Sequence, residues 1–368
     1  MISKKILKNE ERAVLALRTL YRKHGYLPFK MNKFEEYDFY LENRDFLPGD
    51  KIVTFYDTNG KLMALRPDVT LSVIKQSEDI PGVKHRVYYD EFIYRTGRHT
   101  KRFKEMKQTG IECIGDLDLY DIAEVLLLGA DSLAKISPDY VVSISHLGIL
   151  DSLLADTCTD DSMRRRALSY IKTKAAHDLE RLCREHKVPE EKTQRLCKLV
   201  SLYGDLDSVL PQLEVLCISD ESRDGLKEIK IINKIIASTE HRDKFVVDFS
   251  IVNDMDYYNN LLFQGFLKGI SENVMVGGQY DRLLEKLGRE SRGVGFAVYL
   301  NKLDMLDYDK TPKGSLDYLI LYDNEEDIID ISARSRQLVD AGYSVSVQKA
   351  IPKKLRYDQI IDMRREKN

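Results

Sequence analysis

The chain has 368 residues, of which 43% are hydrophobic and 32% are charged, and its formal net charge is −3. This length accommodates two or three compact units with a sizeable core. The composition argues against a membrane protein, because no apolar run approaches the roughly 20 residues that cross a bilayer. The slightly acidic balance gives no general attraction for nucleic acid, whose binding depends on Lys and Arg.

The cysteines indicate a reducing compartment. There are five of them, an odd number with no CxxC pair, which argues against the disulfide framework of a secreted protein. The first 20 residues are basic, but charged residues interrupt their apolar positions, so they lack the continuous core of a signal peptide. We therefore expect a cytoplasmic location.

The first elements in chain order are a helix and an antiparallel sheet. Val14, Leu17 and Tyr21 share one face at helical spacing, and Gly25 can end that helix. Two extended runs then flank Asn59-Gly60, which predicts a hairpin with a two-residue turn because both residues tolerate positive φ. The next extended runs, joined by a polar and basic loop at 97–101, predict two further strands: 85–97 and 104–115.

A helical region separates this sheet from its remaining strands. Residues 118–136 predict a helix, with Asp118 or Asp121 complementing its N-terminal dipole, and 140–146 predict a strand. The segment 151–240 is almost entirely helical and is interpreted as an insertion. Its apolar residues include one stripe at helical spacing: Leu168, Ile171, Ala175, Leu179 and Leu182.

Strand patterns return before a short C-terminal unit. They occur at 244–252, 257–270, 272–288 and 292–300. Pro312 and Gly314 then mark a linker, Lys310–Ser315. Beyond it, 316–322, 325–342 and 343–349 predict a small β-α-β unit.

Two segments carry polar side chains that suit a buried site. Arg66, Asp68 and Thr70 end a hairpin strand, where a capped turn would be a sufficient explanation. Farther on, alternation along a strand places Gln108 and Glu112 on the same face. If that face is buried, the amide and the carboxylate need polar partners, and a small cationic molecule would satisfy them.

Tyrosines beside glycines add to this pattern. Tyr257, Tyr258 and Tyr280 lie in "MDYY" and "VGGQYD", where glycines allow close approach of the backbone. Tyrosine hydroxyls are common in small-molecule pockets, although each residue alone is equally typical of a core. His146, at a predicted strand end, is interpreted as structural and is assigned no role.

In order and spacing these segments resemble the successive motifs of histidyl-tRNA synthetase, a class II aminoacyl-tRNA synthetase. The matching stretches are "ALRPDVT", "IYRTGRHTKRFKEMKQTGIECIG", "MDYY", "VGGQYDRL" and "GVGFAVYLNKL". The resemblance covers roughly the first 305 residues and implies an α+β fold, an antiparallel sheet flanked by helices. The synthetase-like core would comprise 1–150 and 241–309, with a helical insertion at 151–240 and a truncated anticodon-binding-domain-like unit at 315–368.

The resemblance also implies a histidine pocket. Asp68, Thr70 and Gln108 match the residues that hold the α-amino group of histidine. The residues that hold the imidazole are matched by Glu112, Tyr258 and Tyr280.

The positions that would anchor ATP depart from the family pattern. Asn253 stands where active enzymes carry arginine, and Asn301 and Lys302 replace a Glu-Arg pair. Arg95 is kept as a contact for an anion or nucleotide, but Gly97 replaces a glutamate. Lysine lacks the planar fork with which arginine binds phosphate oxygens. The pattern therefore predicts an amino-acid pocket without an adenylation site, and no metal or cofactor is expected.

The regulatory subunits of ATP phosphoribosyltransferase are the family that shows this combination. Membership would imply a non-catalytic chain that assembles with the short-form catalytic subunit in a hetero-octamer, pairs with itself as a class II dimer, and mediates feedback by histidine in histidine biosynthesis. The short C-terminal unit makes tRNA binding unexpected. Two alternatives are a divergent histidyl-tRNA synthetase in which Lys302 and Arg95 suffice for ATP, and a synthetase-like module that senses amino acids or RNA.

Overall fold

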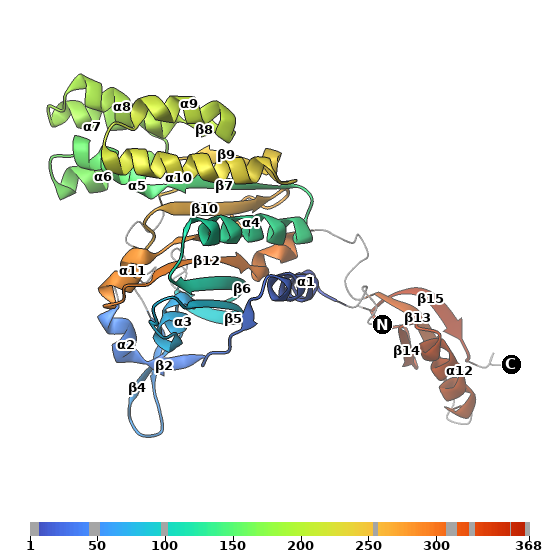
Figure 1. Cartoon of the computed structure of the whole chain (residues 1–368). Helices are drawn as coiled ribbons and strands as arrows, with labels where there is room; N and C mark the ends of the chain where they lie inside the picture. The colour runs from blue at the N-terminus through green and yellow to red at the C-terminus, as the bar shows by residue number, and fades with distance from the viewer. Residues whose placement is uncertain are drawn as a thin grey trace. The chain divides into compact units, whose positions relative to one another are not determined.

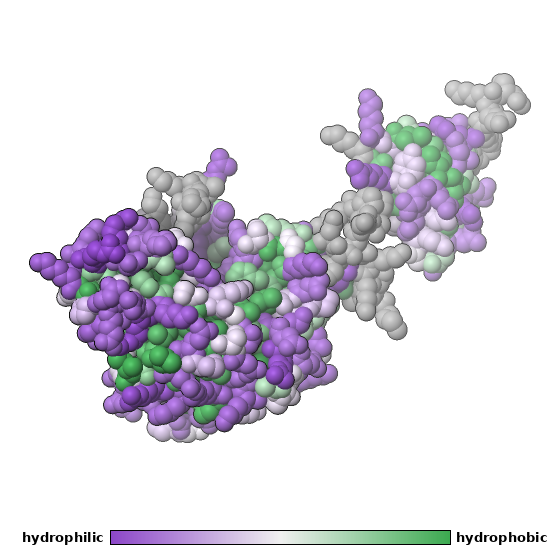
Figure 2. All heavy atoms as spheres, turned by 90° about the horizontal axis from the view of Figure 1, so that it is seen from above, coloured by the Kyte–Doolittle hydropathy of each residue, from purple (hydrophilic) through white to green (hydrophobic). Residues whose placement is uncertain are grey.

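A computed structural model describes residues 7–43, 52–96, 102–252, 257–306, 315–323, 328–353 and 355–364. The chain forms two compact units, Met1–Leu306 and Asp307–Asn368, and Figure 1 shows their elements. Figure 2 shows hydrophilic side chains over most of the visible face of the larger unit, with smaller apolar patches between them. None of the helices in the described ranges is long and apolar enough to cross a bilayer.

The larger unit is built on a mixed sheet whose strand order is β1-β5-β6-β12-β11-β10-β7-β9-β8. The strands are β1 Leu27–Pro28, β5 Lys84–Thr96, β6 Phe103–Gly115, β7 Tyr140–His146, β8 Tyr203–Gly204, β9 Phe245–Asp248, β10 Leu261–Leu267, β11 Met275–Gln279 and β12 Arg292–Tyr299. The pairs between β5 and β7 in this order are antiparallel, as predicted, but β1 pairs with β5, and β7 with β9, in parallel. The predicted antiparallel sheet is confirmed for these central strands, and the two parallel pairs make the sheet as a whole mixed. A long helical connection between β7 and β9 is what permits their parallel pairing.

Two helices cover one face of this sheet. The predicted first helix is confirmed as α1 (Asn9–Lys23), and the predicted long helix as α4 (Leu119–Ile136). The carboxylate of Asp118 accepts the N–H groups of Tyr120 and Asp121, while Asp121 accepts the N–H of Asp118, which forms a capping box.

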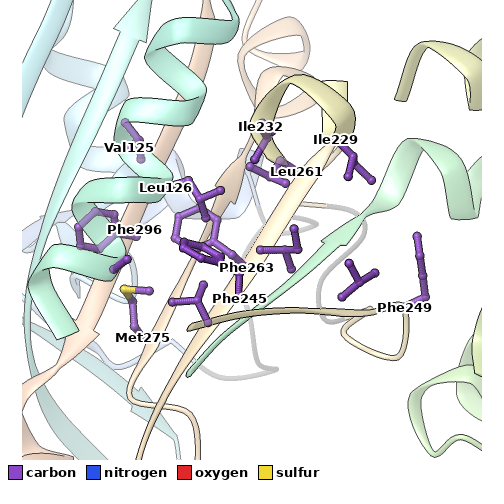
Figure 3. Close-up of a cluster of buried hydrophobic side chains, with 14 of the residues drawn as sticks. Val125, Leu126, Ile229, Ile232, Phe245, Phe249, Leu261, Phe263, Met275 and Phe296 are labelled. Atoms are coloured by element: carbon purple, nitrogen blue, oxygen red, sulfur yellow. The ribbon is translucent and has the colours of Figure 1, made fainter. Parts of the chain in front are cut away.

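The apolar residues of α4 meet the sheet in the main core. Figure 3 shows Leu126 of this helix beside Phe263 of β10, with Met275 and Phe296 from the neighbouring strands close by. Gly129 lets the helix approach closely, since a Cβ there would lie 3.1 Å from the Met275 methyl carbon. The core thus fixes one face of the sheet and leaves the other to carry polar side chains.

Helices occupy the segment predicted as an insertion. They are α5 Leu147–Thr157, α6 Asp161–Lys172, α7 Ala176–Glu185, α8 Glu190–Ser201, α9 Leu206–Leu216 and α10 Asp220–Ala237. Figure 1 shows this group at the β7, β9 and β8 edge of the sheet. The predicted apolar stripe is divided between α6 and α7, because the chain turns at Lys174, whose φ is 55°.

The other face of the sheet carries shorter elements. They are β2 Phe34–Glu36, α2 Tyr37–Glu42, β3 Thr54–Tyr56, β4 Leu62–Leu65, α3 Thr70–Gln76 and α11 Asp281–Lys286, whereas the 3-10 helix η3 Leu300–Met305 packs against α1 in the main core. The predicted hairpin is confirmed as β3 and β4, which pair antiparallel. Its two-residue turn was wrong: the Asp57 carboxylate accepts the N–H groups of Asn59 and Lys61, which widens the loop, and only Gly60 has a positive φ.

The smaller unit has one strand more than predicted. Its elements are β13 Ser315–Leu321, α12 Ile328–Asp340, β14 Val345–Gln348 and β15 Arg356–Asp362. β14 and β15 flank β13, and both pair with it in parallel. The predicted β-α-β unit was thus incomplete. The predicted loop 97–101, and the linker 310–315 apart from Ser315, lie outside the described residues.

A buried arginine joins the hairpin to β5. Arg66 is fully buried, and its guanidinium donates to the Asn32 carbonyl at 2.5 Å, to Glu91 Oε2 at 2.7 Å and to the Phe92 carbonyl at 2.9 Å. These bonds hold the segment after β4 against β5. The next residues in the chain, 67–70, thereby acquire a fixed position over the sheet.

We predict that Arg66→Met lowers the free energy of unfolding by about 3–5 kcal/mol, because it leaves the half-buried Glu91 carboxylate without its cation. Urea denaturation measures the loss. Arg223→Met, which removes an exposed guanidinium from α10, is the matched control and should cost less than about 1 kcal/mol. Equal losses in the two variants would contradict a structural role for Arg66.

Candidate functional site

A pocket lies over β6, β11 and β12 on the face of the sheet opposite α4. All six residues predicted for histidine line it, and so does Arg95. The full lining is Asp68, Val69, Thr70, Tyr89, Arg95, Gln108, Glu112, Tyr257, Tyr258, Val276, Tyr280, Gly295, Phe296, Ala297 and Tyr299. The structure thus brings these side chains together in one pocket, and their role in holding histidine stays a prediction.

Glu112 is at the centre of the pocket and is only 2% exposed. Thr70 Oγ1 donates to its Oε1 at 2.7 Å, and the Tyr280 hydroxyl donates to its Oε2 at 2.6 Å. Burial raises the pKa of Glu112 to about 8, and the negative charge of Asp68 adds to this effect, whereas the two hydroxyl donors oppose it. A buried carboxyl group of this kind is stabilised by any cationic ligand that reaches it.

A second carboxylate stands at the first turn of α3. Asp68 Oδ1 accepts the N–H of Leu71 at 3.0 Å, and Arg95 Nη2 lies 3.5 Å from Asp68 Oδ2. Burial raises the pKa of Asp68, and Arg95 opposes that rise. Arg95 is also held by its Nε, which donates to the Pro67 carbonyl at 2.8 Å. The described lining thus has two acidic side chains and a single guanidinium, which suits a ligand that carries a positive charge.

Tyrosine rings form one wall of the pocket. The Tyr257 and Tyr258 ring centroids are 4.7 Å apart, and those of Tyr257 and Tyr280 are 6.1 Å apart. Burial raises the pKa of the Tyr257 and Tyr280 hydroxyls well above the ordinary value, so they stay neutral O–H groups. Such hydroxyls can fix the orientation of a ligand without adding charge.

Sequence reasoning missed Tyr89 and Tyr299, which also line the pocket. Tyr89 lies opposite Gly110 in the β5/β6 pair, and Tyr299 lies opposite Gln108 in the β12/β6 pair. The register of the strands decides both positions. The adjacent tyrosines of "VYYDEF" were a signal, but the sequence does not show which of them faces the pocket.

The glycine spacing of β12 makes room for these side chains. A Cβ at Gly295 would overlap Glu112 Oε2, and a Cβ at Gly293 would overlap the Tyr280 ring. The strand therefore has glycine at the two positions over which the carboxylate and the ring lie.

Four residues replace the family's ATP anchors, and the two that the structure describes, Asn301 and Lys302, do not line the pocket. Lys302 Nζ donates to the Asn273 carbonyl at 2.6 Å and lies 3.0 Å from Glu272 Oε2. Asn301 is exposed in η3. Asn253 and Gly97 lie outside the described residues. Lys302 is thus engaged with the turn between β10 and β11.

One cluster elsewhere has metal-ligand side chains. Ligand atoms of Asp131, Glu240 and His241 lie within 4.8 Å of one another. Both ring nitrogens of His241 are already paired, Nδ1 with the Tyr140 hydroxyl at 2.6 Å and Nε2 with Asp131 at 3.0 Å. The cluster is accounted for as a polar contact between α4, β7 and the segment before η2 (Arg242–Lys244).

Comparison with known proteins identifies the family. The family model for histidyl-tRNA synthetase matches residues 3–303. The chain belongs to the histidyl-tRNA synthetase family. A relative from Clostridium kluyveri, named ATP phosphoribosyltransferase regulatory subunit, is 28% identical over 293 residues, which cover 77% of this chain and 74% of the relative.

Solved structures share the fold of this family member. An ATP phosphoribosyltransferase regulatory subunit/histidyl-tRNA synthetase from Bacillus halodurans superposes with a TM-score of 0.78 at 21% identity, covering 97% of this chain and 94% of the other. A chain of an ATP phosphoribosyltransferase complex from Thermotoga maritima gives a TM-score of 0.63 at 20% identity, covering 79% and 97%. These similarities confirm the class II synthetase-like α+β fold.

We predict that Glu112 makes the protein less stable as pH rises from about 4.5 to about 8. In that window the folded chain retains a proton on Glu112 that the unfolded chain, with an ordinary carboxyl pKa, has released. The folded state therefore binds more protons, and raising the pH favours unfolding. Across this window the stability of Glu112→Gln relative to the wild type should rise by at least about 1.4 kcal/mol, the equivalent of one pKa unit.

Urea denaturation of both proteins at the two ends of the window measures this difference. Glu105→Gln, an exposed change on the same strand, is the control and should not alter the pH dependence. A difference between Glu112→Gln and the wild type that stays constant with pH would show that Glu112 titrates normally.

Proposed function

We propose that the chain is a non-catalytic regulatory subunit of ATP phosphoribosyltransferase and that it binds free histidine around Glu112. The observation that carries this proposal is the composition of the pocket. It combines every side chain expected to hold histidine, whereas Lys302 is bound to Asn273 and Glu272 instead of lining it. The name of the Clostridium kluyveri relative supports the same function.

Histidine matches the polar groups of the pocket. Its imidazole can pair with the Glu112 carboxyl and the Tyr280 hydroxyl, which already share a hydrogen bond, while Tyr258 lies beside them. Its ammonium group can pair with Asp68, near Thr70 and Gln108. The ammonium group then compensates the buried Asp68 carboxylate, and the imidazole shares a proton with the Glu112 carboxyl group, which lowers the cost of burying both acidic groups.

The partner in this proposal is the short-form catalytic subunit of ATP phosphoribosyltransferase. A chain of similar fold occurs in the Thermotoga maritima complex, which supports an assembly of this kind. The proposed assembly is a hetero-octamer in which the regulatory chains pair as class II dimers, and tRNA is not a partner. The five free cysteines are in keeping with a cytoplasmic site of action.

Feedback control follows if histidine binds two states of the complex with different affinities. A ligand can shift such an equilibrium only by the ratio of those affinities. We propose that the state favoured by histidine is the less active one. The proposal thus assigns activation to assembly and inhibition to occupancy of the Glu112 pocket.

Phosphoribosyl transfer to ATP by the catalytic subunit of the same genome, measured with and without this chain, tests the proposal. We expect activity to rise at least about tenfold on mixing and to fall when histidine is added. No stimulation at any ratio would contradict the regulatory role. Histidine-dependent exchange of pyrophosphate into ATP would instead support a synthetase.

We predict that Glu112→Ala raises the histidine concentration needed for half-inhibition at least about tenfold, since a lost charged hydrogen bond costs about 1.5–3 kcal/mol. Glu105→Gln should leave inhibition unchanged, because Glu105 is exposed and does not line the pocket. Unchanged inhibition in Glu112→Ala would show that the effector acts elsewhere.

A further inference from the structure

We propose that Arg95 pairs with Asp68 at the place that the ligand's ammonium group would take, and that it changes partners when an amino acid binds. In this exchange the ammonium replaces the guanidinium beside Asp68, and the guanidinium turns to the ligand's carboxylate. The inference rests on the proposed function, because it takes an amino acid as the ligand. It adds a device by which the pocket selects a zwitterion.

The contact between Arg95 and Asp68 is long enough for a ligand to replace it. The distance from Arg95 Nη2 to Asp68 Oδ2 is 3.5 Å, longer than the 2.7–2.9 Å typical of a charge-assisted hydrogen bond. The Nε end of the same guanidinium is fixed by the Pro67 carbonyl at 2.8 Å. A rotation about that fixed end can therefore move the Nη groups away from Asp68 without freeing the side chain.

Asp68 itself is held in place by the backbone. Its Oδ1 accepts the N–H of Leu71 in the first turn of α3, so the carboxylate stays where it is when Arg95 leaves. Its Oδ2 faces Arg95. The side chain of Asp68 is 12% exposed and that of Arg95 is 22% exposed, so the arginine lies on the more open side of the pair.

Charge balance explains why Asp68 needs the guanidinium of Arg95 when no ligand is bound. Without a cation, Asp68 would be a buried carboxylate near the buried Glu112, an arrangement that is costly in a poorly solvated site. A bound amino acid supplies one ammonium and one carboxylate. The ammonium compensates Asp68, and the carboxylate compensates the displaced guanidinium, so no charge is left unpaired.

An amine that lacks the carboxylate cannot complete this exchange. Histamine carries the imidazole and the ammonium of histidine but no carboxylate. Its ammonium would displace Arg95 from Asp68 and leave the guanidinium without an anionic partner. Arg95 should therefore favour histidine and disfavour histamine. Removing the guanidinium should reverse both effects, since Asp68 then has no competing partner.

Calorimetric titration of the full chain with histidine and with histamine, before and after Arg95→Met, tests the exchange. We expect the variant to bind histidine at least about tenfold more weakly, which corresponds to about 1.4 kcal/mol, and histamine several-fold more tightly. Arg95→Gln should likewise weaken histidine binding and strengthen histamine binding. Lys107→Met removes a positive charge from the other face of β6 and should leave both affinities within about twofold.

The other outcomes are distinguishable. Equal weakening of both ligands in both Arg95 variants would overturn the exchange and leave Arg95 as a support of the pocket wall. Unchanged histamine affinity with weakened histidine binding would also overturn it, because Arg95 would then contact the carboxylate without competing for Asp68. Wild-type protein that binds neither ligand would overturn the proposed function itself, and the exchange with it.

Discussion

The buried carboxyl group of Glu112 is the constraint on which the rest of the site depends. A carboxyl group that is only 2% exposed needs hydrogen-bond partners inside the protein. Thr70 donates to one of its oxygens and Tyr280 donates to the other. Three separate stretches of the chain must therefore arrive at one point. β6 brings Glu112, the start of α3 brings Thr70, and the residue before α11 brings Tyr280.

The fold meets this requirement in two ways. On one side, Arg66 ties the segment before α3 to β5, so that Asp68 and Thr70 are held over the sheet. On the other, β12 passes beneath Glu112 and Tyr280 with glycines where any side chain would overlap them. The packing of α4 on the opposite face keeps the strands in register. The pocket around Glu112 is thus a product of the whole sheet.

Much of this was predictable from local patterns. Strand alternation placed Gln108 and Glu112 on one face, helical spacing identified α1, and the order of the motifs indicated which segments would meet. The places of Tyr89 and Tyr299 were not predictable, because they depend on how β5 and β12 register against β6. The contact between Arg95 and Asp68 likewise joins two segments, and the spacing of residues along the sequence does not show that they lie close together.

The errors of prediction have the same origin. Parallel pairing of β7 with β9 depends on the path of the chain through six helices, and the hairpin loop was widened by one carboxylate, that of Asp57. In both cases a longer-range or side-chain interaction overrode the local signal. The segments that line the pocket could be recognised because they belong to motifs whose order is itself informative, whereas strand pairing at the edges of the sheet could not.

A crystal structure of the chain with saturating histidine would test the central claim most directly. We expect one histidine per chain in the pocket, with an imidazole nitrogen at hydrogen-bond distance, about 2.7–3.2 Å, from a Glu112 oxygen. An empty pocket under those conditions, or histidine bound at another surface, would contradict it.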